Sequence, residues 1–224
     1  MIETVLEPRV LEAKDWATYL FVFSFALIAI TRTAFETRFN DFLKILVSDK
    51  YIKVYKDTSH LMSGFTILLF IVQIISFSFF IQLILSHFGY VSKTDWILFI
   101  RIFTFIGVFI LSKFLIEKII AATFNIEEFI EQFNLQKVSY RTFISLLLLP
   151  INIYLYYNDI SSNLFIYCVI AVILIINLLA YLVSLKIYQN LIIGKLFYFI
   201  LYLCALEIAP YYFIYYLITK NSAH

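Results

Sequence analysis

Residues 61–85 have the sequence LMSGFTILLFIVQIISFSFFIQLIL, which is 25 consecutive positions without a charged side chain. A helix of about 20 apolar residues, rising 1.5 Å per residue, crosses the roughly 30 Å hydrocarbon core of a bilayer. Residues 160–185, ISSNLFIYCVIAVILIINLLAYLVSL, form a second uncharged run of 26 positions. These two runs predict two membrane-spanning helices.

The composition of the whole chain supports the same interpretation. Of its 224 residues, 63% are hydrophobic and 14% are charged, and its mean hydropathy is +0.93. Soluble domains have about 45–50% apolar and about 25% charged residues, so an ordinary cytosolic enzyme and a disordered chain are excluded. The formal net charge is only +2, and we therefore expect no nucleic-acid partner.

Four further stretches can reach spanning length. Residues 196–218 carry one charge, Glu207, and three shorter stretches suffice if a flanking Arg or Lys extends toward the headgroups. The predicted spans are 16–34, 61–85, 96–116, 142–158, 163–185 and 196–218. We therefore expect an all-α protein, with residues 1–224 forming a single integral membrane domain of six transmembrane helices.

The distribution of basic residues predicts the orientation of these spans. Twelve Lys and Arg residues lie in the loops after the first, third and fifth spans, and four lie on the opposite side. Cytoplasmic loops carry the excess of Lys and Arg, so both termini are expected on the periplasmic side. Trp16, Trp96 and tyrosines within 154–157 and 211–216 fall at the predicted outer ends, where an aromatic belt is typical.

Two amphipathic helices are expected on the cytoplasmic side, one over 35–47 and one that begins at Asn125. Their apolar positions include Phe35, Phe39, Phe42 and Leu46 in the first helix, and Ile126, Phe129, Ile130 and Phe133 in the second. Two interpretations are open. These helices either seal the loops against the headgroups or form a contact surface for a partner protein.

Polar side chains within the predicted spans are the candidate functional residues, because an ionisable group is costly at that depth. They are Arg101, Glu207, Gln73, Asn152 and Asn177, with Pro150 and Pro210 as expected helix breaks. Such residues around a polar midplane patch are typical of secondary transporters. Alternatively, Arg101 extends to the membrane surface and the others are hydrogen-bonded packing devices between helices. Whether Arg101 pairs with Glu207 stays open.

No catalytic residue, metal site or cofactor is expected. His60 and His87 flank the second span at opposite ends, so they do not match the paired ligands of a haem-binding bundle. The sequence has neither a His-Glu-x-x-His site nor a Gly-rich phosphate loop. Cys168 and Cys204 lie in apolar runs, where a disulfide framework or a metal cluster is not expected.

Three stretches carry a resemblance: Asp15-Trp16 before a short helix that ends at Thr31-Arg32, the run LLLLP at 146–150, and LYLCALEIAP at 201–210. The chain resembles an uncharacterised family of small multi-pass inner-membrane proteins of the Bacteroidota, classed as a domain of unknown function. This resemblance implies the inner membrane of a Gram-negative cell. It brings no catalytic residues.

The function we expect is that of a non-enzymatic accessory or scaffold subunit of an inner-membrane complex, with protein translocation or secretion as one candidate process. The expected partners are the lipid bilayer and other inner-membrane subunits. The alternative is a small transporter or proton-coupled carrier that uses Glu207 and Arg101. The four glycines form no Gly-x-x-x-Gly pair, which weighs against close helix crossings and mobile gates.

Overall fold

The computed structural model describes residues 15–45, 51, 54–55, 63–123, 127–158 and 163–194, with side chains of the last helix up to residue 179. Its helices are α1 (Asp15–Ala34), α2 (Glu36–Leu43), α4 (Gly64–His87), α5 (Trp96–Thr123), α6 (Glu127–Tyr157) and α7 (Asn163–Gly194). These residues contain helices and no strand. The predicted all-α class is therefore confirmed for the described part of the chain.

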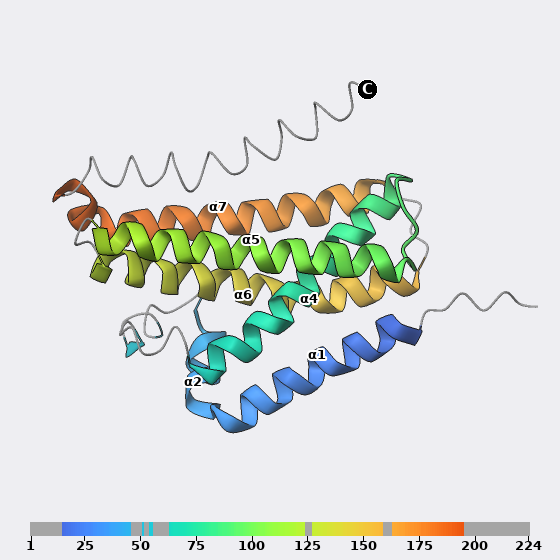
Figure 1. The fold of residues 1–224 in the computed structure, drawn as a ribbon, viewed down its shortest axis with the longest axis horizontal. Coiled ribbons are helices and arrows are strands. Elements are labelled where there is room, and N and C mark those ends of the chain that lie inside the picture. Colours follow the sequence, from blue (N-terminus) through green and yellow to red (C-terminus); the bar gives the residue numbers. More distant parts are fainter. Residues whose placement is uncertain are drawn as a thin grey trace, which may run out of the picture.

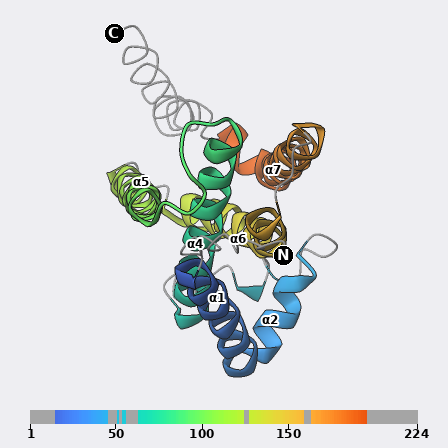
Figure 2. The same cartoon turned by 90° about the vertical axis from the view of Figure 1, so that its right-hand side faces the viewer.

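Helices α4 and α6 form the centre of the molecule. α4 also packs against α1 and α5, while α6 packs against α5 and α7. Viewed end-on, α5 and α7 lie on opposite sides of the central pair, and α1 with α2 lies beneath it (Figure 2). The axes of α5, α6 and α7 run in nearly the same direction along the molecule, whereas α4 crosses them obliquely (Figure 1).

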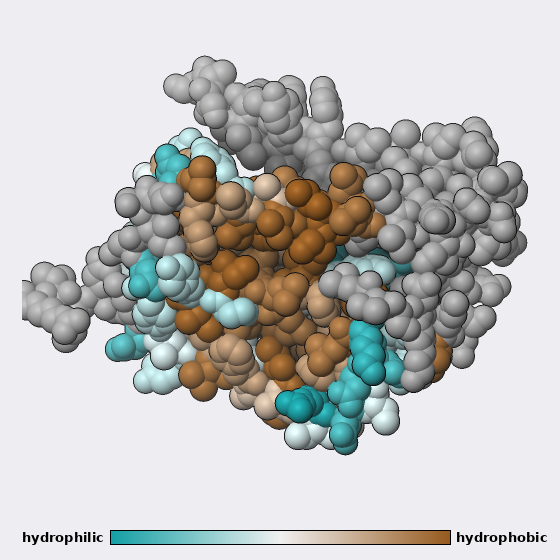
Figure 3. All heavy atoms as spheres, turned by 180° about the vertical axis from the view of Figure 1, so that it is seen from behind, coloured by the Kyte–Doolittle hydropathy of each residue, from teal (hydrophilic) through white to brown (hydrophobic). Residues whose placement is uncertain are grey.

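Among the residues that the structure describes, four helices are long and apolar enough to cross a membrane: Asp15–Ala34, Gly64–His87, Trp96–Thr123 and Phe133–Tyr157. Their burial differs sharply, because 61% of the most apolar window is buried in α4 and only 6% in α5. α4 is thus the core of the bundle and α5 is an outer helix. One face of the molecule is hydrophobic across its middle, with hydrophilic residues gathered at its margins (Figure 3). The predicted span 196–218 lies outside the described residues.

The structure corrects two expectations about α6, namely a separate amphipathic helix before the span and a helix break at Pro150. Residues 127–157 form one helix of 31 residues, and its apolar part, Phe133–Tyr157, includes nearly all of the span predicted at 142–158. Residues 127–149 contain neither Gly nor Pro, so nothing interrupts the helix there. Pro150 lies inside α6 without ending it. Its ring faces outward, and Leu148, Leu149 and Asn152 are buried on either side of it, so helix packing offsets the lost hydrogen bond.

The connection between α4 and α5 is held by hydrogen bonds to its backbone. Tyr90 N donates to Leu85 O over 3.1 Å, and Gly89 has a positive φ of 77°, which together form a Schellman cap that glycine accommodates without strain. Gln82 Nε2 donates to Asp95 O over 2.8 Å. This buried amide fixes the path of the chain into α5.

An aromatic cluster gathers at this same end of the bundle. The Trp16 ring lies 5.2 Å from that of Trp96 and stacks on Phe79 at 5.6 Å. Tyr156, from the end of α6, also contacts Trp16 and Phe79. The aromatic residues at the start of α1, the start of α5 and the end of α6 therefore meet at one end of the molecule.

At the opposite end, α2 folds back beneath α4. Phe39 and Phe42 are 5% and 1% exposed, and they lie in a core cluster with Tyr51, Phe65 and Tyr140. On α6, Ile130 and Phe133 are also buried, and Phe35 is half-buried against Phe65. This corrects the interpretation of these apolar positions as a partner-contact surface, because the chain's own core covers them. Leu46, Ile126 and the Phe129 side chain lie outside the described residues.

Candidate functional site

A seam of buried polar side chains joins α4 to α6. Thr142 Oγ1 donates to Gln73 Oε1 over 2.9 Å, and the Gln73 side chain is fully buried. Both residues lie well inside helices that are long enough to span a membrane. A side-chain hydrogen bond between such helices favours their association, because the bilayer core offers no water as a substitute partner.

The seam continues along α6 toward the aromatic end. Asn152 Nδ2 donates to the backbone oxygen of Ser76 over 2.7 Å, and Ser76 Oγ donates to Ser145 O over 2.8 Å. Ser145 Oγ in turn donates to Thr142 O over 2.7 Å. These five residues, which we call the polar seam, are Gln73, Ser76, Thr142, Ser145 and Asn152.

The seam leaves some polar atoms unmatched within the described part of the chain. Gln73 Nε2 and Asn152 Oδ1 are buried without a hydrogen-bond partner there, as are both amide atoms of Gln136. The seam contains no ionisable group, so it can orient and hold the two helices but cannot itself transfer a proton. Its geometry is that of a packing device between spans.

The structure brings together two of the five polar residues that the sequence singled out. Gln73 and Asn152 both belong to the polar seam, whereas Arg101 is exposed on α5. Asn177 is exposed as well, and its Nδ2 donates to Ile173 O in its own helix over 2.9 Å. Glu207 and Pro210 lie outside the described residues, and so does any pairing of Glu207 with Arg101.

A buried arginine near the start of α4 was not expected from the sequence. Arg38 is 5% exposed, and its Nη1 donates to Ser63 Oγ over 2.6 Å. Its guanidinium lies over the Phe65 ring at 4.6 Å and the Tyr55 ring at 5.0 Å. The signal was present in the sequence, because Arg38 falls three residues after Phe35 and four before Phe42 on the same helical face.

Tyr51 completes this arginine site. Its hydroxyl accepts from Arg38 Nε and Nη2, each over 3.4 Å. Burial raises the pKa of the Tyr51 phenol, and the neighbouring Arg38 charge partly opposes that rise. The phenol is therefore neutral at physiological pH, and Arg38 is held by aromatic faces and hydroxyl groups.

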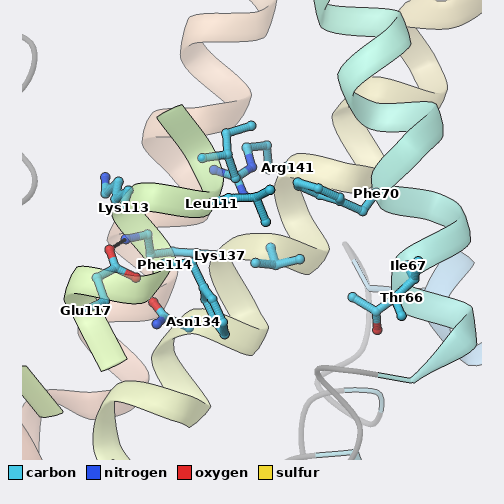
Figure 4. Close-up of a pocket in the computed structure, with 12 residues that line it drawn as sticks. Thr66, Ile67, Phe70, Leu111, Lys113, Phe114, Glu117, Asn134, Lys137 and Arg141 are labelled. Carbon is cyan, nitrogen blue, oxygen red and sulfur yellow. Dashed lines mark hydrogen bonds and ion pairs between the residues drawn. The ribbon is translucent and has the colours of Figure 1, made fainter. Parts of the chain in front are cut away.

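A cavity of about 160 Å³ lies between α4, α5 and α6 (Figure 4). Its polar lining consists of Thr66, Lys113, Glu117, Asn134, Lys137 and Arg141. Its apolar wall consists of Ile67, Phe70, Ile110, Leu111, Phe114 and Val138. Ile67 and Leu111 are each about half exposed, at 51% and 52%, so the cavity opens at the surface between α4 and α5.

Four charged residues are among those that line this cavity. Lys137 Nζ lies 3.4 Å from Glu117 Oε1, and Glu117 is 4% exposed. The lining therefore carries three cationic side chains and one carboxylate. Glu117 was not among the candidate residues expected from the sequence, although its position four residues after Lys113, in a helix that extends past the predicted span, could have indicated a buried charge.

No curated protein and no solved structure matches the chain. A family model, described as Domain of unknown function (DUF4271), matches residues 17–218. This range contains Arg38, the polar seam and the cavity, and on the strength of this match the chain belongs to the DUF4271 family.

Proposed function

We propose that this protein is a non-enzymatic accessory or scaffold subunit of an inner-membrane complex, and that α5 is the helix that binds its partner. One observation carries the proposal. α5 is 28 residues long, yet only 6% of its most apolar window is buried. The partner would cover a helix that the described part of this chain leaves open.

A single stripe on α5 has the dimensions of a helix-docking surface. Its members, spaced three or four residues apart and all exposed, are Arg101, Phe105, Val108, Ser112, Leu115 and Ile119. At 1.5 Å per residue this α5 stripe is about 27 Å long, close to the thickness of the hydrocarbon core. It can therefore lie against one transmembrane helix of a partner over nearly its whole length.

Charge indicates the chemistry of that partner helix. Arg101 is the one ionisable member of the α5 stripe, about 7 Å along the helix from Trp96. A carboxylate on the facing helix would neutralise the guanidinium, and a polar group opposite Ser112 would add a hydrogen bond. The proposed occupant is thus an apolar transmembrane helix with an acidic residue near the Trp96 end.

The placement of Arg101 also bears on the alternative function. A carrier built on Arg101 and the midplane amides would need them around a common path. Arg101 instead lies on the exposed stripe of α5, while Gln73 and Asn152 are buried between α4 and α6. This separation weighs against a carrier whose path includes all three of these residues, whereas Glu207, which the alternative also uses, lies outside the described residues.

The test is purification of the tagged full-length protein from its native membrane in a mild detergent, followed by mass spectrometry of proteins present in fixed proportion. Val108 on the α5 stripe and Val22 on α1 are similarly exposed, at 59% and 62%. We expect Val108→Trp to release a stoichiometric partner and Val22→Trp to retain it. Retention of the partner by both variants would reject α5 as the docking helix, and a wild-type protein without partners would reject the function.

A second pair of variants tests the predicted chemistry of the contact. Arg101→Gln removes the charge, whereas Arg101→Lys keeps it. We expect the partner to be lost with Arg101→Gln and largely kept with Arg101→Lys, and equal retention by both would contradict an acidic partner helix. The identity of the partner would then assign the process, with protein translocation or secretion as one candidate.

A further inference from the structure

The cavity between α4, α5 and α6 presents an almost wholly apolar surface. Phe70 from α4 and Leu111 from α5 point toward one another across it (Figure 4). The wall also includes Ile110, Phe114 and Val138. Such a surface fits hydrocarbon, because a polar ligand would lose its hydrogen bonds to water without replacement there.

The charged lining residues do not indicate a charged ligand. Lys137 is paired with Glu117 over 3.4 Å. Lys113 and Arg141 also have interactions within the chain. We therefore assign no role in ligand attraction to these four side chains.

The size of the cavity limits what can enter it. Its volume is about 160 Å³, and an apolar cavity of about 150 Å³ stays dry and binds benzene, so a hydrocarbon segment of about six carbon atoms fits. Lipid chains are as apolar as the wall, and the hydrophobic effect gives no driving force between them. Entry is favoured instead by dispersion contacts, which the wall of an unfilled void would lack.

The position of the cavity identifies the source of the hydrocarbon. With Trp96 at headgroup level, as is typical of tryptophan, Leu111 lies about 22 Å along α5, inside a core roughly 30 Å thick. The opening is flanked by Leu111 and Ile67, which are about half exposed. Both belong to helices long and apolar enough to cross a membrane. The cavity is thus continuous with the surface that lipid chains would cover.

We propose that this cavity binds one acyl chain of a bilayer phospholipid, which enters sideways between α4 and α5 and lies between Phe70 and Leu111. The site selects the chain and not the headgroup. This proposal requires that α4 and α5 span a membrane, but it is independent of the accessory function and of the α5 stripe.

The experiment uses the full-length protein in phosphatidylcholine vesicles with brominated acyl chains, compared with the same vesicles without bromine. Bromine quenches the fluorescence of a tryptophan that it contacts, and the signal of the wild-type protein is subtracted. The reporter is Phe70→Trp. Ile30→Trp is the lipid-exposed control, because Ile30 is 51% exposed and also lies about 22 Å along its helix, from Asp15 in α1. Phe65→Trp is the buried control, because Phe65 is 2% exposed and does not line the cavity.

We expect quenching of Phe70→Trp to approach that of Ile30→Trp and to exceed that of Phe65→Trp at least about two-fold, since quenching requires contact. Quenching no greater than that of Phe65→Trp would overturn the proposal, because the cavity would then be closed to lipid or filled by another part of the chain.

A second substitution distinguishes a chain inside the cavity from one outside it. Val138→Phe, added to the Phe70→Trp protein, places a ring in the cavity from α6 and should reduce the quenching about two-fold or more by removing the space for the acyl chain. Val22→Phe is the matched control on the exposed face of α1 and should leave the quenching unchanged. An equal effect of the two substitutions would overturn the proposal.

Brominated phosphatidylglycerol should quench Phe70→Trp to the same extent as brominated phosphatidylcholine. Stronger quenching by phosphatidylglycerol would show recognition of the headgroup and contradict a site that selects the chain alone. If Phe70→Trp does not elute as a single gel-filtration peak, Phe114→Trp on the α5 wall replaces it, with the same controls and the same deciding outcomes.

Discussion

The hydrogen bond between Thr142 and Gln73 provides the sharpest test of the polar seam. Thr142→Val removes the hydroxyl while keeping the shape of the side chain. Gln73 Oε1 then loses the hydroxyl that donates to it over 2.9 Å. Because Gln73 Nε2 already lacks a hydrogen-bond partner in the described part of the chain, neither polar atom of the Gln73 amide keeps a partner there. Hydrogen bonds between membrane helices are worth about 0.6 kcal/mol on average and about 1.7 kcal/mol at most, and an unsatisfied buried acceptor adds to the cost of losing one. We expect Thr142→Val to lower the free energy of unfolding by about 1–2 kcal/mol.

Unfolding can be followed without a label. The two tryptophans of the chain, Trp16 and Trp96, have ring centroids 5.2 Å apart in the aromatic cluster, and their fluorescence changes when α1 and α5 separate. The assay is titration of the detergent-solubilised protein with sodium dodecyl sulfate. Thr33→Val is the matched control. Within the described residues, the exposed Thr33 hydroxyl donates only to carbonyl oxygens of its own helix, and its substitution should change stability by less than about 0.5 kcal/mol.

A double-mutant cycle separates this bond from general packing. In a Gln73→Leu background the partner of Thr142 is absent, so Thr142→Val should cost close to nothing. The same loss in both backgrounds would show that the two side chains are not coupled. An effect no larger than that of Thr33→Val would likewise refute the assignment of the seam as a device that holds α4 against α6.

Three further predictions can be checked in the same titration. Arg38→Lys should destabilise the protein by about 1–3 kcal/mol, because an ammonium group cannot reproduce the contacts that the planar guanidinium makes with Ser63 and the surrounding aromatic rings. Wild-type stability of this variant would contradict a stabilising role of the arginine site. Phe42→Asp should prevent folding by burying a carboxylate, whereas Leu43→Asp, at the exposed neighbouring position, should be tolerated. If Leu43→Asp were the more damaging substitution, α2 would pack with its other face against the core. Gly89→Ala should cost about 1 kcal/mol from its positive φ alone, since no atom lies within 4 Å of the added methyl group, and Gly89→Asn should cost less.

The candidate site was only partly predictable from the sequence. Gln73 and Asn152 were identified because a polar side chain in a long apolar run is conspicuous, and both are buried in the seam. Their partners Ser76 and Thr142 were not identified, because short hydroxyl side chains are common in apolar helices. Their role can be recognised only when the residues facing them on the neighbouring helix are known. Arg38 and Glu117 were missed for a related reason. A charged residue next to a predicted span is normally assigned to a solvent-exposed loop, and only the tertiary structure shows that these two side chains are buried.

Some features of this protein are determined by the sequence alone. The helical class and the approximate positions of α1, α4 and α5 follow from the length and hydropathy of apolar runs, which are properties of consecutive residues. The shared location of Trp16 and Trp96 at one end follows from the alternation of spans and loops, and the structure confirms that the two rings meet.

Only the tertiary structure decided which faces of these helices are inside. α4 is predominantly apolar on every side despite a few polar residues, so its hydropathy shows no clear periodicity that distinguishes the buried face from the exposed one. The continuity of α6 through Pro150, the burial of Phe39 and Phe42, and the assembly of the cavity all depend on how helices rotate and cross. Helix rotation and crossing are determined by contacts between residues far apart in the chain. The hydropathy of consecutive residues carries no information about those contacts.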